Sequence, residues 1–334
     1  MRRLLVAALA MALGAVGVAV LAQANVSRHL RIAMIGKSFA NPVFLAAHRG
    51  AQDTAAQLGT QLGVDIEVSI LTPPREDPAL QVQAVEKAVA SRVDAILIAV
   101  SDAQVLTPAI DAAVAKRVPV MTFDSDAPAS KRFCHYGPDN QKVGARLVEE
   151  VAARIGDRGK VALLVGNPEA PNLRQRTEGA RQALLQHPGL ELVGAFSHVE
   201  KPQDAAAEVM RVDAAHPDLK AWMMVGGWPM FRSSQSLALL NDLSSRKLFV
   251  VAVDALPEQL LYVDKGLAVL YAQPVYEWGR VGVTTIVDKV QLHKQVPENI
   301  RMDLVRIDRQ NLADWARQLH SWGFSIDPGQ YQER

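Results

Sequence analysis

The chain has 334 residues, of which 49% are hydrophobic and 21% charged, and its formal net charge is +1. This length suits one large core or two lobes of roughly 100 to 200 residues each, and we expect two similar lobes. Acidic and basic residues are interspersed, so no nucleic-acid surface is predicted, and the single cysteine, Cys134, excludes an internal disulfide and any multi-thiolate metal site.

The N-terminus has the pattern of a secretory signal. Residues 1–3 are Met-Arg-Arg, residues 4–22 are apolar and rich in alanine, and residues 22–24 are Ala-Gln-Ala, a small-x-small cleavage sequence. We expect cleavage after Ala24 and export to a Gram-negative periplasm. The alternative is an uncleaved membrane anchor, which the length of the apolar run allows. No cysteine follows the cleavage sequence, so no lipid anchor is expected.

Apolar runs and helical patterns alternate along the rest of the chain. Strands are predicted at residues 30–36, 64–71, 95–100, 118–124, 133–136, 160–166, 190–197, 221–227, 248–254, 268–273 and 303–308. Helices are predicted at residues 42–62, 80–91, 106–116, 142–155, 176–185, 204–214, 233–243, 276–290 and 312–322. Two successive series of this kind, with short connections, predict α/β lobes with doubly wound parallel sheets.

Several of the predicted strands end on a polar side chain. Asp124 ends the run VPVMTFD, Asp254 ends FVVAVD, and Gln273 ends VLYAQ. Continuous apolar runs are typical of parallel strands buried on both faces, and open α/β sheets bind ligands just beyond the carboxyl ends of such strands. We therefore expect a ligand cleft at the strand ends. Helix capping or a turn is the alternative for the two aspartates, since aspartate is favoured at both.

The candidate site residues are of the types that bind polyols. Carboxylates, amides and guanidinium groups bind vicinal hydroxyls in pairs, and aromatic faces cover the C–H faces of a sugar ring. The candidates are Asn41, Phe44, Asp124, Arg176, Trp228, Asp254 and Gln273. For Phe44 and Trp228 the alternative is ordinary core packing.

Motifs of common enzyme classes are missing from the sequence. It has no Gly-x-Gly-x-x-Gly, no Gly-x-Ser-x-Gly and no Walker-type lysine loop, and its eight histidines lack metal-ligand spacing. No cofactor, no metal and no enzymatic activity are therefore predicted. The enzymatic alternative is a periplasmic hydrolase that uses Asp124 and Asp254 as a glycosidase acid and base.

A series of short motifs follows in a characteristic order between residues 30 and 308. The motifs are ANPVF at 40–44, RGA at 49–51, VPVMTFD at 118–124, GPDN at 137–140, RQRTEG at 174–179, VAVD at 251–254 and AQ at 272–273. Together they resemble the periplasmic sugar-binding proteins of the ribose/galactose type, which serve carbohydrate ABC transporters. The resemblance implies the type I periplasmic binding protein fold, in which two Rossmann-like lobes joined by three hinge crossings close on a monosaccharide.

The same resemblance implies the domain organisation. Residues 1–24 are the signal peptide, residues 26–137 with 274–302 are the N-terminal lobe, and residues 138–273 with 303–334 are the C-terminal lobe, which includes a C-terminal helix. It also implies that the lobes hinge where these segments meet.

The resemblance also implies a role for each matching candidate. The expected roles are a hydroxyl-binding amide for Asn41, a stacking face for Phe44, carboxylate acceptors for Asp124 and Asp254, a cationic fork for Arg176 and a hinge-side amide for Gln273. Three positions depart from the ribose pattern: Val43 replaces an aromatic residue, Ser125 replaces an arginine, and Gly226-Gly227 beside Trp228 replaces Asn-Asp. The particular sugar is therefore left open.

The leading hypothesis is a monomeric periplasmic solute-binding protein that captures a monosaccharide or polyol and delivers it to an ABC permease in the inner membrane. The alternative is a sugar sensor that presents its closed form to a chemoreceptor or sensor kinase. A repressor of the same architecture is disfavoured, because an export signal stands where a helix-turn-helix would be.

Overall fold

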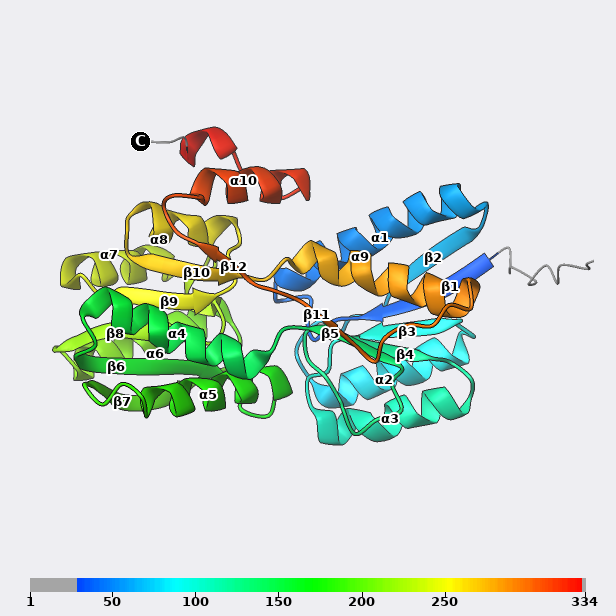
Figure 1. The fold of residues 1–334 in the computed structure, drawn as a ribbon, viewed down its shortest axis with the longest axis horizontal. Coiled ribbons are helices and arrows are strands. Elements are labelled where there is room, and N and C mark those ends of the chain that lie inside the picture. The colour runs from blue at the N-terminus through cyan, green and yellow to red at the C-terminus, as the bar shows by residue number, and fades with distance from the viewer. Residues whose placement is uncertain (1–28, 332–334) are drawn as a thin grey trace, which may run out of the picture.

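The computed structural model describes residues 29–331, so the predicted signal peptide and its cleavage site lie outside the described residues. The chain forms two α/β lobes side by side (Figure 1). The expected fold class, two Rossmann-like lobes with largely parallel sheets, is confirmed.

The N-terminal lobe contains a six-stranded sheet in the order β11-β5-β4-β3-β1-β2, with every neighbouring pair parallel. Its strands are β1 (His29–Ile35), β2 (Asp65–Ile70), β3 (Ala95–Ile98), β4 (Val120–Phe123), β5 (Cys134–Gly137) and β11 (Asn299–Arg301). Its helices are α1 (Val43–Leu62), α2 (Pro78–Ala90), α3 (Ala103–Ala115) and α9 (Val275–Ile286). Figure 1 shows α1 and α9 on one face of this sheet and α2 and α3 on the other.

The C-terminal lobe contains a second six-stranded sheet in the order β12-β10-β9-β8-β6-β7, in which only the β10 and β12 pair is antiparallel. Its strands are β6 (Gly159–Gly166), β7 (Leu190–Ser197), β8 (Leu219–Met224), β9 (Phe249–Val253), β10 (Ala268–Ala272) and β12 (Val305–Ile307). Its helices are α4 (Asn140–Ile155), α5 (Pro171–Leu184), α6 (Pro202–Ala215), α7 (Ser236–Arg246), α8 (Leu260–Asp264) and α10 (Leu312–Ser321), and short helical turns occupy Trp228–Met230, Pro257–Gln259 and Pro328–Tyr331. In the N-terminal lobe, a helical turn at Val287–Gln291 continues α9.

Local sequence explains most of these elements. The central strands β3, β4 and β9 are buried along their whole length, as expected where helices cover both faces of a sheet. Asp77 and Asp102 cap α2 and α3 by accepting hydrogen bonds from backbone N–H groups of the first turn. Gly63 ends α1 in the left-handed conformation that favours glycine.

The chain passes between the lobes in three places: from β5 to α4, from β10 to α9, and from β11 to β12. The boundaries predicted after residues 137, 273 and 302 fall in these segments, and hinge motion at them stays a prediction. Several elements differ from the sequence expectations, among them the unpredicted helix α8. The strand β11 was not predicted, because three residues at a sheet edge leave little pattern, and α5 begins five residues before the predicted helix, which places Arg176 inside it.

Candidate ligand-binding cleft

All seven predicted site residues line one cavity between the lobes, at the carboxyl ends of the strands. Asn41, Phe44 and Asp124 come from the N-terminal lobe, and Arg176, Trp228, Asp254 and Gln273 come from the C-terminal side. The free space among the side chains is about 20 Å³, which holds roughly one water molecule. A ligand larger than a water molecule therefore enters this cavity only when the two walls move apart.

Asp124 and Asp254 occupy equivalent positions in the two lobes. The backbone N–H of each continues the strand ladder, donating to the carbonyl of Tyr136 for Asp124 and of Tyr271 for Asp254, both at 3.0 Å. Each aspartate then adopts a left-handed conformation, with φ of +59° and +77°, which aspartate tolerates better than most residues. The chain thus turns sharply at the end of each strand.

The two carboxylates bind amide side chains of the cleft. Asp124 Oδ1 accepts a hydrogen bond from Asn172 Nδ2 at 3.0 Å, and Asp254 Oδ1 accepts one from Gln273 Nε2 at 2.7 Å. The helix-capping alternative would require backbone N–H groups of a helix N-terminus as donors to these atoms. The observed donors are side-chain amides instead. Burial raises the pKa of Asp254, and the opposing influences are the hydrogen bond from Gln273 and the charge of Arg176.

Arg176 connects three segments of the C-terminal wall of the cleft through hydrogen bonds of its guanidinium group. Its Nε donates to Asn140 Oδ1 at 2.8 Å, its Nη1 to the Val225 carbonyl at 2.9 Å and its Nη2 to Gln273 Oε1 at 2.8 Å. Its side chain is 2% exposed, and burial lowers its pKa, opposed by the charges of Asp124 and Asp254. The arginine therefore holds Gln273 in place beside Asp254, and its expected role as a cationic fork for a ligand stays a prediction.

Aromatic rings lie on both walls of the cavity. On the N-terminal side, Phe44 packs against Phe123 and Trp278, with ring centroids 6.3 and 6.0 Å away. Trp228 lies on the opposite wall, 4% exposed, where its ring fills the space beside Gly226. Rings on two sides suit a ligand with two C–H faces. Sequence reasoning missed Trp278, although it lies in the first turn of the predicted helix that follows Gln273.

Three polar residues of the cavity were also missed: Lys37, Asn172 and Glu200. Lys37 is 3% exposed, and its Nζ donates to Asn172 Oδ1 at 3.0 Å and lies 3.8 Å from an oxygen of Asp124. Lys37 follows the apolar run of β1, so the rule that found Asp124 could have found it. Asn172 and Glu200 lie at a helix start and in a loop, where no local pattern marks a cleft residue.

The fold and this cleft define a class of ligand-binding proteins whose two lobes enclose a small polar solute. Residues 32–295 match the family model of the periplasmic binding protein domain. The chain therefore belongs to this family, and its fold is the type I fold of the sugar-binding members. The expectation of a binding protein rather than an enzyme is confirmed. Within residues 29–331, every helix is too short or too polar to cross a membrane.

Individual relatives agree with this assignment. The chain is similar to the ribose import binding protein of Escherichia coli (strain K12), with 26% identity over 308 residues that cover 90% of this chain and 98% of the relative. A solute-binding protein of Agrobacterium vitis bound to α-D-tagatopyranose has a TM-score of 0.78 at 23% identity, covering 89% of this chain and 99% of that one. A XylFII-LytSN complex has a TM-score of 0.76 at 23% identity, covering 84% and 98%.

Proposed function

We propose that this protein binds a monosaccharide or related polyol in the interlobe cleft and delivers it to the permease of an ABC importer. One observation carries the proposal: two carboxylates at equivalent strand ends of the two lobes line the same cavity, between aromatic rings on both walls. A ligand that contacts both carboxylates holds the lobes together, because its differential affinity favours the closed arrangement.

The chemistry of the cavity supports a ligand rich in hydroxyl groups. When ionised, the carboxylates of Asp124 and Asp254 accept hydrogen bonds and donate none, as a ligand with many hydroxyl donors requires. Lys37 uses one of its three donors on Asn172, which leaves donors for a ring or hydroxyl oxygen. The names of the ribose import binding protein and of the tagatopyranose-bound relative are consistent with such a ligand.

The proposed location is the periplasm, reached through the N-terminal signal. If the signal peptide is cleaved after Ala24, N-terminal sequencing of a periplasmic extract gives Asn25 as the first residue. An intact Met1 on a membrane-bound product would contradict the proposal.

The decisive experiment identifies the ligand. The mature chain is purified from periplasm under gentle conditions, and native mass spectrometry determines the mass of any co-purified molecule. Calorimetric titration then measures binding of D-ribose, D-arabinose, D-tagatose and myo-inositol. Micromolar or tighter binding of one sugar supports the proposal, and absence of binding across a wider sugar panel overturns it.

A sensor role is the second candidate, favoured by the structural relative that forms a complex with LytSN. The two roles differ in a deletion strain grown on the identified sugar. An import role predicts loss of sugar uptake. A role in sensing alone predicts normal uptake and loss of the transcriptional response to the sugar.

A further inference from the structure

A second set of contacts between the lobes lies at one edge of the cleft. Glu76, in the loop between β2 and α2 of the N-terminal lobe, meets two loops of the C-terminal lobe. Asn167 Nδ2 donates to Glu76 Oε1 at 3.0 Å, and the Asn167 backbone N–H donates to Glu200 Oε1 at 3.2 Å. Asn167 thus holds the carboxyl groups of Glu76 and Glu200 next to each other across the lobe boundary.

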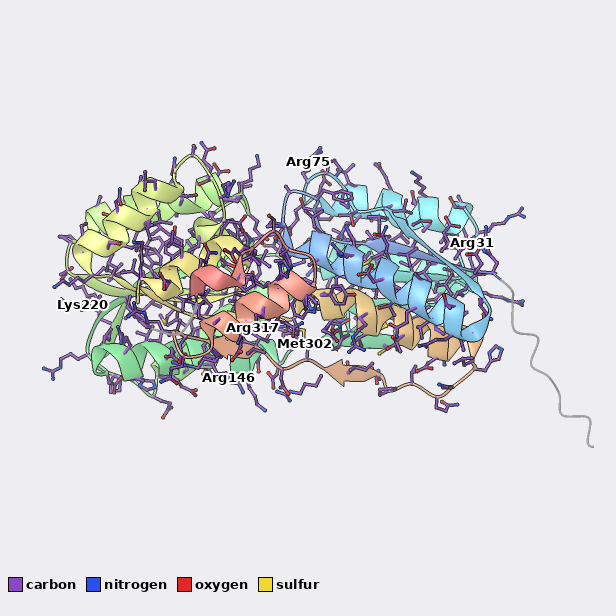
Figure 2. The ribbon with its side chains drawn as sticks, turned by 90° about the horizontal axis from the view of Figure 1, so that it is seen from above. Arg31, Arg75, Arg146, Lys220, Met302 and Arg317 are labelled. Carbon is purple, nitrogen blue, oxygen red and sulfur yellow. The ribbon has the colours of Figure 1, made fainter. Side chains whose placement is uncertain are left out.

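This contact lies opposite the segments that connect the lobes. Figure 2 shows Arg75, the neighbour of Glu76, at the boundary between the lobes on the side away from Met302, which lies on the third crossing. A rotation of the lobes about their connections moves this edge further than any point near the crossings. The contacts of Glu76 with Asn167 and Glu200 therefore break when the cleft opens.

Two carboxyl groups held on one asparagine repel each other when both are ionised, so the closed arrangement favours one bound proton. The cations that act on Glu200 are Lys37 and Arg176, both on the inner side of the cleft. The attraction of these cations lowers the pKa of Glu200, but it is weaker than the effects that raise this pKa. Burial, followed by the negative charge of Glu76, raises the pKa of Glu200 to about 8.

We infer that Glu76, Asn167 and Glu200 form a proton-dependent latch that holds the two lobes of the closed protein together. The inference rests on the proposed function, since the latch closes over the ligand cleft. It adds a regulation that the binding function does not require: ligand affinity that depends on external pH.

The direction of the pH dependence follows from linkage. Opening of the cleft breaks these contacts and would expose both glutamates to solvent, where an ordinary glutamate has a pKa of about 4.3. The closed protein retains a proton up to a higher pH, so the latch is fully present below the ordinary pKa and is lost as the pH rises through about 8. Because one proton is involved, ligand affinity falls by at most about tenfold per pH unit in this window.

The first test needs no sugar. Small-angle scattering measures the radius of gyration of the mature protein at pH 6 and pH 8.5, and we expect a larger radius at pH 8.5. The variant Glu76→Gln supplies an amide that donates to Glu200 without a bound proton and accepts from Asn167. We expect it to be as compact at pH 8.5 as at pH 6. Glu169→Gln is the matched control, because Glu169 is exposed two residues from Asn167, and it keeps the wild-type pH response.

The second test measures the affinity for whichever sugar of the panel binds, at the same two pH values. Wild-type protein and Glu169→Gln should bind at least tenfold more weakly at pH 8.5, and Glu76→Gln should lose this difference. The inference is overturned if neither radius nor affinity of the wild type changes with pH, or if Glu76→Gln responds like the wild type. Failure of every sugar to bind would instead overturn the proposed function, and the scattering result would still decide the latch.

Discussion

At the level of single residues, Asp254 is a buried carboxylate whose position is set by strand β9 and Gln273 and which can accept hydrogen bonds from a ligand. It is 7% exposed, it follows the fully buried strand β9, and the amide of Gln273 binds one of its oxygens. Burial of a carboxylate disfavours its ionised form, so the empty protein gains little stability from this charge. A ligand hydroxyl that binds the carboxylate gains a strong acceptor.

We therefore predict that Asp254→Ala weakens sugar binding by about tenfold to 150-fold, since a hydrogen bond to a charged group contributes about 1.5 to 3 kcal/mol. The melting temperature of the unliganded variant should stay within a few degrees of the wild type. Calorimetric titration and thermal melting measure the two effects, with the exposed Glu258→Ala of the same lobe as control. Full affinity with a lowered melting temperature would remove Asp254 from the binding site.

Asp213 gives a second prediction at this scale, about stability. It is 1% exposed in α6, and its Oδ1 accepts a hydrogen bond from Trp222 Nε1 at 2.8 Å. Burial, together with the neighbouring Asp242, raises the pKa of Asp213 to about 7. The stability contributed by the protonated form is fully present below the ordinary aspartate pKa of about 3.9 and is lost as the pH rises through about 7.

The melting temperature of the wild type should accordingly fall between pH 5 and pH 8. Asp213→Asn keeps an oxygen for Trp222 and cannot ionise, so its melting temperature should fall less over the same range. Thermal melting by circular dichroism at both pH values checks this. An equal fall in both proteins would show that Asp213 is not the titrating group.

At the level of elements, glycines allow the helices α4 and α5 to touch. A Cβ atom on Gly144 of α4 would lie 1.9 Å from the carbonyl oxygen of Arg176 on α5, and one on Gly179 of α5 would lie 2.0 Å from that of Gln141. This close approach of the two backbones sets the position of Arg176 and, through it, of Gln273.

Gly144→Ala should therefore force α4 and α5 apart, at a cost of about 1 to 3 kcal/mol in the free energy of unfolding, typical of overpacking. It should also weaken sugar binding, because Arg176 moves with its helix. Urea unfolding and calorimetric titration measure the two effects, and Lys142→Ala, exposed on the same helix, is the control. Unchanged stability would mean that the helices have room for a methyl group.

At the level of the whole molecule, the C-terminal segment from α10 onward touches both lobes. Trp315 Nε1 donates to the carbonyl of Ala255 in the C-terminal lobe at 2.7 Å. Trp322 stacks on Tyr276 of α9, with ring centroids 5.7 Å apart and planes 5° from parallel. Figure 1 places α10 at the top of the molecule, above β10 and β12. The family match ends at residue 295, so this C-terminal segment, which we call the strap, lies beyond the match.

We predict that Trp322→Ala makes the lobes separate more easily, because it removes an aromatic pair worth about 0.5 to 1.5 kcal/mol. Sugar affinity should fall about twofold to tenfold, and the radius of gyration of the unliganded protein should increase. Trp322→Phe keeps a stacking ring and serves as control. If affinity and radius both stay at wild-type values, the strap does not link the lobes functionally.

The sequence by itself determined the fold class and the general location of the site. Buried parallel strands are recognisable from local composition, and the polar residues that end them lie near a cleft because parallel strands end together. This reasoning placed Asp124, Asp254 and Gln273 at the cavity. The same position after a strand indicated Asn41, and the residue types added the aromatic candidates.

Only the tertiary structure decided how the cleft residues bind one another. Glu200, Asn172 and Trp278 reach the cavity from a loop and two helices, where the local sequence follows the needs of a turn or a helix and carries no sign of a distant partner. The role of Arg176 depended on Gln273, 97 positions away, and the contact of Asn167 with Glu76 spans 91 positions. Such pairs are set by how the lobes face each other, and periodicity within single elements contains no information about that arrangement.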